Sequence, residues 1–169
     1  MTNKIKWLLS VVVFCFAMTL SALAQSDSDV PSSCMLTTLD GVPAHNLQAL
    51  QGKVVYVDFW ASWCPPCVKS FPFLSQLDHD LKDQGLQVIG INLDEKIADA
   101  ETFLTNYPVN FEIALDTDKQ CAKDFGVVAM PSSYLIDRKG VIRHVHQGFR
   151  PSEAKDLRLA IEYLLSEPL

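Results

Sequence analysis

Apolar and polar positions along the chain follow two kinds of pattern. Three short runs, residues 54–59, 86–94 and 133–137, are almost continuously apolar, as strands buried on both faces of a sheet are. Between the first two runs, apolar residues recur at steps of three and four, which predicts one face of an α-helix. These residues are Val68, Phe71, Leu74, Leu77 and Leu81. The order of strand, helix and strand indicates a βαβ unit.

The second half of the chain continues in the same way. Helical periodicity recurs at 97–107, 118–125 and 152–165. The sequence DRKG, residues 137–140, is typical of a hairpin turn and leads into a closing antiparallel strand, VIRHVHQG. The whole pattern therefore predicts an α/β sandwich, in which helices flank a mixed central sheet.

The N-terminus reads as an export signal. Lys4 and Lys6 precede an apolar run at 7–20, and Ala22 and Ala24 fit the small-x-small pattern of a cleavage site. We expect a signal peptide at 1–24. An uncleaved anchor remains the alternative, because the run extended to Ala24 could just reach across a bilayer. Either way, the rest of the chain is expected outside the cytoplasm, in the periplasm.

The remaining sequence suits one compact domain. Cleavage after Ala24 leaves 145 residues (169 − 24), of which the polar stretch 25–33 is expected to be a flexible leader and 34–169 a single domain. The formal charge of −6 becomes −8 when Lys4 and Lys6 are removed. An acidic domain repels phosphate, so nucleic acid is not an expected partner, and membrane contact is expected only if the signal is uncleaved.

Two cysteines three positions apart are the strongest chemical signal. Cys64 directly follows a predicted strand and stands at the start of the predicted helix, with Pro65 and Pro66 in its first turn. There the Cys64 thiol is expected to face unsatisfied backbone N–H groups and the positive end of the helix dipole, which lower a thiol pKa. Cys67 lies one turn further and points inward. We therefore predict that Cys64 is an exposed nucleophile and Cys67 a shielded resolving cysteine.

Reversible redox chemistry competes with other uses of such a pair. Zinc needs about four ligands and the chain has no second CxxC, while a disulfide closing so small a ring removes little unfolded-state entropy. We expect no bound cofactor and no metal. His144 and His146 alternate along one strand and so share a face, which leaves a copper chaperone using Cys64 and Cys67 as an alternative. A solvated edge strand is the simpler explanation of the two histidines, since exposed histidine is common.

The segments VDFWASWCPPC (57–67) and MPSSYLIDRKG (130–140) resemble the thioredoxin superfamily, and more closely its exported TlpA/ResA-like thiol–disulfide oxidoreductases. The resemblance covers nearly all of 34–169 and implies a thioredoxin-like fold with an N-terminal β extension. It also implies a cis Met130–Pro131 bond beside Cys64, with the backbone of Met130 pairing with a substrate strand. Trp63 is then expected to be a recognition surface.

Asp58 is an acid inside an apolar run. Burial raises a carboxyl pKa, so Asp58 could take and return the proton of Cys67. This arrangement resembles that of thioredoxins. The alternative is a side chain that reaches solvent at the strand end. ResA-like proteins often carry Glu three residues after the second cysteine, where this chain has Ser70. The acid–base role is therefore assigned to Asp58, and specificity for apocytochrome c is not implied.

The direction of electron flow can also be argued from the motif. Pro65 and Pro66 bring no charge that would stabilise a thiolate further, so we expect a potential nearer ~−270 mV than ~−120 mV. That predicts a reductase of disulfides in client proteins, recharged by a DsbD-like membrane electron donor. A dithiol oxidase or isomerase is the alternative.

Two further cysteines, Cys34 and Cys121, complete an even set in the mature chain. Some TlpA-like proteins tie their N-terminal segment to the domain by such a bridge, so the pair is a candidate structural disulfide. Two separate buried thiols are the alternative.

Overall fold

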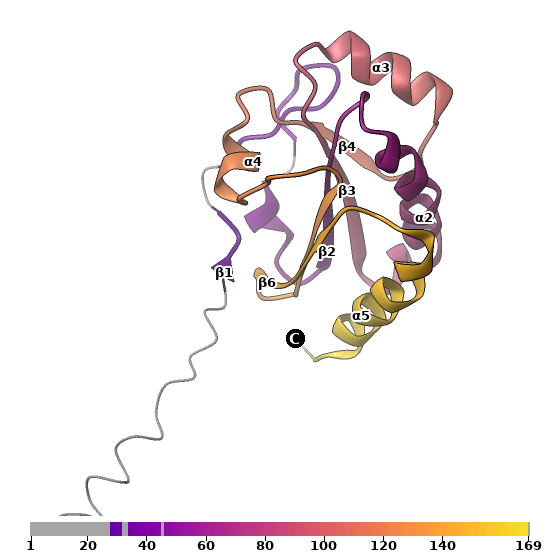
Figure 1. The fold of residues 1–169 in the computed structure, drawn as a ribbon. Helices are drawn as coiled ribbons and strands as arrows, with labels where there is room; N and C mark the ends of the chain where they lie inside the picture. Colours follow the sequence, from indigo (N-terminus) through magenta and orange to yellow (C-terminus); the bar gives the residue numbers. More distant parts are fainter. Residues whose placement is uncertain (1–27, 32–33, 45, 169) are drawn as a thin grey trace, which may run out of the picture.

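The computed structural model describes residues 28–31, 34–44 and 46–168 (Figure 1). The predicted signal peptide lies outside these residues. The strands are β1 (Ser28–Asp29), β2 (Val54–Trp60), β3 (Leu86–Asn92), β4 (Glu112–Leu115), β5 (Ser132–Ile136) and β6 (Val141–Gln147). The α-helices are α2 (Pro65–Leu81), α3 (Ile97–Asn106), α4 (Gln120–Asp124) and α5 (Ala154–Ser166). Short 3₁₀ turns are η1 (Leu47–Leu50), η2 (Lys82–Gln84) and η3 (Pro151–Glu153).

The six strands form one mixed sheet in the order β1-β6-β5-β2-β3-β4. β2, β3 and β4 are parallel, whereas β5 is antiparallel to β2, and β6 is antiparallel to β5. The βαβ unit followed by a hairpin and a final helix is thus confirmed, and the fold is thioredoxin-like.

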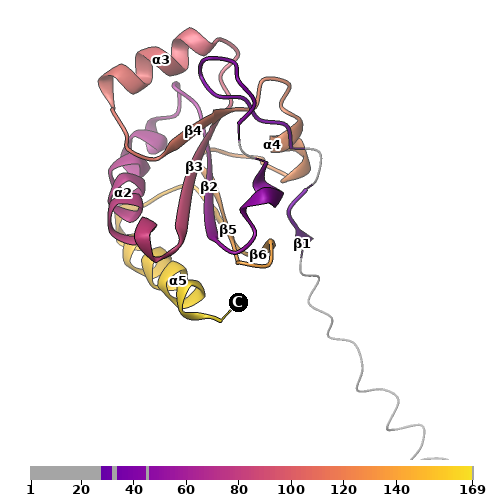
Figure 2. The ribbon, with the colours of Figure 1, turned by 180° about the vertical axis from the view of Figure 1, so that it is seen from behind.

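The sheet separates two packed layers. α2 and α5 lie on one face and α4 lies on the other, as both ribbon views show (Figures 1 and 2). β2 is buried along its whole length and supplies both layers, because its side chains alternate between the two faces. Val54, Tyr56 and Trp60 pack with α2 and α5, and Val55, Val57 and Phe59 pack with α4.

The N-terminal extension reaches both edges of the sheet. β1 pairs with β6, and Thr37 exchanges backbone hydrogen bonds with Leu115 of β4. Part of the leader that we expected to be flexible therefore forms a strand, and Val30 beside it is buried. Within the described residues, no helix is long and apolar enough to cross a membrane.

Two elements differ from the pattern-based expectation. β4 was not predicted, since it has only four residues and no extended apolar run marks it. The helix expected from residue 118 begins later, at Gln120, because Lys119 takes a left-handed conformation (φ 60°) and Asp118 accepts a hydrogen bond from the Gln120 N–H.

Candidate active site

Cys64 and Cys67 form a disulfide at the start of α2, with their Cα atoms 5.4 Å apart. Cys64 is the N-cap residue and Pro65 and Pro66 fill the first two helical positions. Both sulfur-bearing side chains pack in the same cluster as Trp60 and other residues under α2. The sequence-based prediction that the two cysteines can pair across one turn agrees with this geometry.

The backbone around Cys64 corrects one expectation. We expected unsatisfied N–H groups near the thiol, but Pro65 and Pro66 have no N–H, and the Cys67 N–H donates to the Cys64 carbonyl (3.1 Å). The helix dipole remains, while the number of free donors at the first turn is small. A Cys64 thiolate is therefore stabilised less strongly than the helix position alone predicts.

Burial also differs from the expectation that Cys64 is exposed. Only 3% of Cys64 and 0% of Cys67 is exposed to solvent. Cys64 nevertheless lines a pocket of about 420 Å³, and Cys67 does not. The pocket wall comprises residues 63–66, Leu93, Ala122 of α4 and the loop 127–130. Cys64 is thus the cysteine that a partner can reach, and the pocket determines that access.

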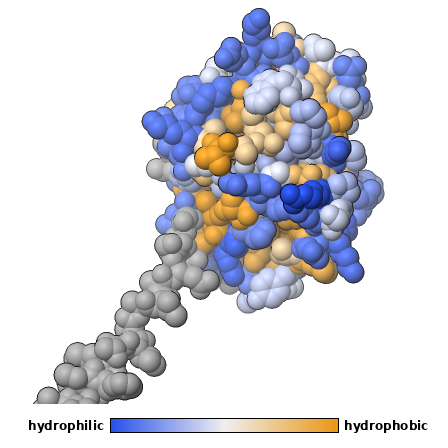
Figure 3. Space-filling view, viewed as in Figure 1, coloured by the Kyte–Doolittle hydropathy of each residue, from blue (hydrophilic) through white to orange (hydrophobic). Residues whose placement is uncertain are grey.

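The rim of the pocket is apolar. Trp63 is 67% exposed and Val128 is 81% exposed, and both line the pocket together with Met130. Apolar patches interrupt the hydrophilic surface on the face turned toward the viewer in Figure 3. Exposed apolar residues beside the Cys64–Cys67 disulfide are suited to binding an unfolded or extended polypeptide.

The loop opposite Cys64 carries a cis peptide bond between Met130 and Pro131, as the resemblance implies. Met130 lines the pocket and Pro131 is buried behind it, immediately before β5. The Ser132 hydroxyl donates to the Ala129 carbonyl (2.7 Å) and so fixes the turn. Met130 is therefore held in position to line the same pocket as Cys64.

A polar network that the sequence pattern did not reveal supports the turn before Cys64. The Asp94 carboxylate accepts hydrogen bonds from the Ser62 N–H (3.0 and 3.1 Å) and from the Ser62 hydroxyl (3.0 Å). The Asn92 amide donates to the same carboxylate (2.8 Å). Asp94 thereby anchors the backbone two residues ahead of Cys64, and its position at the end of the strand predicted for 86–94 was the only available signal.

Asp58 lies in the middle of β2 and is completely buried. Tyr56 and Trp60, two positions to either side, pack in the cluster that contains Cys64 and Cys67. Because strand residues alternate between faces, the Asp58 carboxyl points to this same face. The alternative of an Asp that reaches solvent is therefore wrong.

The surroundings of Asp58 favour its protonated form. Burial raises the pKa of Asp58 to about 7, and a hydrogen bond from Ser133 opposes that rise. The Ser133 hydroxyl donates to Oδ1 (2.6 Å), whereas Oδ2 is buried without a hydrogen-bond partner among the described residues. Burial, with a smaller contribution from Asp58, also raises the pKa of Tyr56. Asp58 is thus a carboxyl that can exchange a proton near neutral pH, with one oxygen free.

Ser70 and the histidines take other places. Ser70 is buried, and its hydroxyl donates to the Cys67 carbonyl (3.1 Å). The rings of His144 and His146 stack 6.3 Å apart on β6, on one face as predicted. Among the described residues, no group of three or more His, Cys, Asp or Glu is arranged to hold a metal ion, so the copper alternative has no support in this part of the chain.

A second disulfide joins Cys34 to Cys121, with Cα atoms 4.4 Å apart. Both residues are buried in the cluster under α4. Asp116 accepts hydrogen bonds from the N–H groups of Cys121 (3.2 Å) and Ala122 (2.8 Å), which holds the start of α4. Burial raises the pKa of Asp116 and these N–H groups oppose the rise. Lys119 donates to the carbonyls of Asp116 (3.0 Å) and Asp94 (2.8 Å) and so links the start of α4 to the residue that anchors the turn before Cys64.

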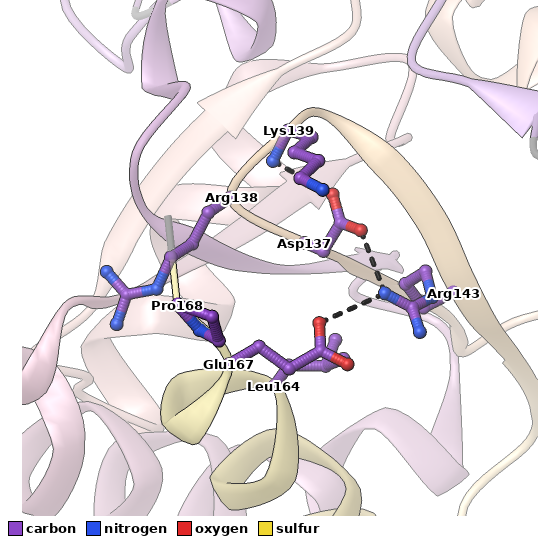
Figure 4. Close-up of a pocket in the computed structure, with 7 residues that line it drawn as sticks. All are labelled: Asp137, Arg138, Lys139, Arg143, Leu164, Glu167 and Pro168. Carbon is purple, nitrogen blue, oxygen red and sulfur yellow. Dashed lines mark hydrogen bonds and ion pairs between the residues drawn. The ribbon is translucent and has the colours of Figure 1, made fainter.

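Another hollow, drawn in Figure 4, contains no cysteine. Arg143 on β6 forms ion pairs with Asp137 (3.0 Å) and Glu167 (3.1 Å) there, and the dashed lines mark both. The Arg143 guanidinium contributes to lowering the pKa of Asp137, after the Val141 N–H, against the opposing effect of burial. The contacts tie the β5–β6 turn to the end of α5, which indicates a structural role.

Comparison with known proteins gives consistent matches. The Redoxin family matches residues 25–161. Thiol-disulfide oxidoreductase ResA of Bacillus subtilis is 35% identical over 60% of the chain and 57% of its own length, which is less than two thirds of that relative. ResA of Bacillus thuringiensis is 31% identical over 70% of the chain and 68% of its own length. A crystal structure from Chlorobium tepidum, assigned as a thiol:disulfide interchange protein DsbE, is 40% identical with a TM-score of 0.77, covering 83% of this chain and 97% of that one.

Proposed function

The chain belongs to the Redoxin family, and from this premise we propose that it is a thiol–disulfide oxidoreductase that reduces disulfides of client proteins outside the cytoplasm. One observation carries the proposal: Cys64, at the start of α2, lines an apolar pocket while its partner Cys67 is shielded behind it. The names of the ResA and DsbE relatives support the same chemistry.

The reduced pair would act in two exchanges. The Cys64 thiolate attacks one sulfur of a client disulfide, so that a mixed disulfide forms and the other client sulfur leaves as a thiolate. Cys67 then loses its proton to Asp58, and its thiolate attacks the Cys64 sulfur. The second client thiolate leaves and the Cys64–Cys67 disulfide forms. Two electrons pass to the client, and its two thiolates take up protons.

The environment of Cys64 supports reduction over oxidation. A strong oxidant needs a heavily stabilised thiolate, and the two prolines remove N–H donors from the first turn of α2. We place the reduction potential nearer ~−270 mV than ~−120 mV. A dithiol oxidase or isomerase would use the same residues, so the measured potential separates these activities.

Export and partners complete the proposal. The N-terminal pattern of lysines, apolar run and small residues supports periplasmic location, either free or anchored by an uncleaved segment. In an oxidising compartment a reductase must be recharged, and a DsbD-like membrane donor suits that need. Trp63, Met130 and Pro131 are proposed to bind the client, since Trp63 and Met130 line the pocket and Pro131 adjoins it.

Reduction of insulin by dithiothreitol tests the activity. We expect Cys64→Ser to fall to the uncatalysed rate with its fold intact, because the nucleophile is lost and the bond removed spans only three residues. Cys67→Ser is the matched variant: it should accumulate a mixed disulfide with its client, which mass spectrometry would identify. A Cys64→Ser protein as active as wild type would refute the redox function.

A further inference from the structure

A buried acid that exchanges a proton in every turnover needs a path to water, and Asp58 has no exposed surface. A row of polar side chains crosses the sheet from this residue. Asp58 on β2 is the direct cross-strand partner of Ser133 on β5, and Ser133 is the direct partner of His146 on β6. Glu153 of η3 follows, with its Oε2 3.2 Å from Nε2 of His146.

The members of the row share one face of the sheet. Leu135, two positions after Ser133, packs with α2 and α5, and it pairs directly with His144. Alternation therefore places Ser133, His144 and His146 on the same face as Asp58. Directly opposed residues have Cβ atoms ~4.5–5.5 Å apart, which is within reach of an imidazole ring or one bridging water.

Exposure rises along the row in steps. Asp58 is 0% exposed and Ser133 is 4% exposed. The side chain of His146 is 18% exposed and that of Glu153 is 29% exposed. Polar groups thus lead from the deepest acid of the site to the surface at the start of α5.

His146 has a feature that packing alone does not explain. Its Nε2 is buried and lacks a hydrogen-bond partner within the described structure, although it lies at ion-pair distance from Glu153. A buried polar atom without a hydrogen bond is rare in a folded protein. Glu153 itself is held by Arg150 (2.6 Å), so its carboxylate is fixed beside the ring.

We propose that Ser133 and His146 form the outlet through which the proton that Asp58 takes from Cys67 reaches solvent beside Glu153. The inference rests on the proposed function, because it serves the second thiol–disulfide exchange. Protonated Asp58 gives its proton to the Ser133 oxygen as the Ser133 hydroxyl passes its own proton to one nitrogen of His146. The other ring nitrogen releases a proton to water or Glu153, and return to the starting tautomer resets the ring.

The groups facing this row come from several elements. Tyr56 flanks Asp58 on β2, and Cys67 belongs to the α2 side of the same cluster. His144 stacks beside His146 on β6, and Glu153 with Arg150 lies beyond the ring. α5 contributes apolar residues, Ile161 and Leu164, to the shared cluster. His144 pairs across the strands with apolar Leu135, so it is not a member of the row from Asp58 to Glu153. It therefore serves as a matched control for His146.

A pH-jump experiment separates an outlet from a structural effect. A mixed disulfide of Cys64 with 5-thio-2-nitrobenzoate is prepared, and release of the coloured thiolate reports attack by Cys67. Protein equilibrated at about pH 5 holds Asp58 protonated, and a jump to about pH 8 crosses its pKa of about 7. Release must then wait until Asp58 has lost its proton.

We expect His146→Gln to lengthen this lag about tenfold, less than the ~10²–10⁴-fold that loss of a general base costs. The same variant equilibrated at about pH 8 should release thiolate at the wild-type rate, since Asp58 is already ionised there. His144→Gln should show the wild-type lag, and imidazole in the buffer should shorten the lag of His146→Gln.

Ser133 supplies a second test of the outlet. Ser133→Ala should lengthen the lag, and Ser133→Thr, which keeps the hydroxyl, should restore it. An unchanged lag in His146→Gln, or equal lags in His144→Gln and His146→Gln, would overturn the outlet while the redox function stands. A wild-type protein that releases no thiolate at either pH would remove the redox function, and the outlet with it.

Discussion

The two disulfides of this protein are the same bond in two different settings. Cys64–Cys67 joins residues three positions apart, and Cys34–Cys121 joins residues 87 positions apart. The exposed fractions do not separate them, since Cys64 is 3% and Cys34 is 5% exposed. The surroundings do: Cys64 forms part of a pocket wall at a helix start, whereas Cys34 and Cys121 pack in the core under α4.

The comparison shows that access to the sulfur atoms and the length of the loop that each bond closes decide the role of each disulfide. A short loop contributes little to stability, so opening Cys64–Cys67 leaves the fold in place. A long loop restricts the unfolded chain strongly, so Cys34–Cys121 is suited to holding the N-terminal segment on the sheet. Cys64–Cys67 can therefore be reduced and reoxidised while Cys34–Cys121 stays intact in the same compartment.

Graded reduction tests this contrast most strongly. We expect mild dithiothreitol to open Cys64–Cys67 on the order of 100-fold faster than Cys34–Cys121, because attack on a disulfide depends on access to its sulfur. Peptide mapping after alkylation would show Cys64 and Cys67 labelled first. Equal labelling of all four cysteines, or labelling of Cys34 without any reductant, would break the comparison.

Removing the long-range bond should chiefly affect stability. The double variant Cys34→Ser, Cys121→Ser is expected to lose about 4 to 5 kcal/mol of unfolding free energy, by the chain-entropy relation for a loop of this length. Urea unfolding measures the loss, and the folded fraction should still reduce insulin. An unchanged urea midpoint would show that the bond does not carry the stabilisation assigned to it.

The buried acid Asp58, which shares a cluster face with Cys64 and Cys67, should make stability depend on pH. The folded protein holds Asp58 at a pKa of about 7, above its ordinary 3.8, so folding favours the protonated carboxyl. This contribution is complete below about pH 4 and is lost as pH rises through about 7, with an upper bound of roughly 4 kcal/mol at 1.36 kcal/mol per pKa unit. Thermal unfolding of the oxidised protein across this range measures it.

Asp58→Asn provides the control for that pH dependence. The variant should be more stable than wild type at about pH 8, since a buried charge is absent, and the difference should vanish near pH 4. Turnover at neutral pH should be slower, because Asn cannot accept the Cys67 proton. A variant with wild-type turnover at every pH would exclude Asp58 from the mechanism.

The smallest expected effect concerns Asp94, which links the turn before Cys64 to the region around Cys121 through Lys119. Asp94→Asn weakens the hold on Ser62 and should cost about 1 kcal/mol of stability and change the alkylation rate of Cys64 a few-fold. The exposed Asp83→Asn on η2 is the matched control and should change neither quantity. Identical Cys64 reactivity in both variants would show that the turn before Cys64 does not depend on Asp94.

Much of this architecture could be predicted from local pattern. The stripe of α2 and the apolar runs of β2, β3 and β5 depend on neighbours a few residues apart, which periodicity reports. The CxxC and Met-Pro segments predicted the site residues because these segments resemble the thioredoxin superfamily. β4 was not predicted, because its four residues are only partly buried and give too weak a hydrophobic pattern.

The partners of the site residues could not be predicted in the same way. Ser133 lies 75 positions from Asp58, and Asp94 lies 32 positions from Ser62. Which side chains meet depends on strand order and register, and local pattern does not encode either. The same limit explains the leader: its polar composition predicted flexibility, yet Ser28 and Asp29 pair with β6 through their backbone.

The path of the N-terminal segment has a consequence for solubility. Strands at the margins of a sheet expose unpaired backbone groups to which another chain can add. Here one segment occupies part of both margins, through β1 against β6 and Thr37 against β4, and Cys34 fastens it between them. We expect cleavage of that bond to release the cover from both margins at once, so the long-range disulfide also protects the protein against intermolecular strand addition and aggregation.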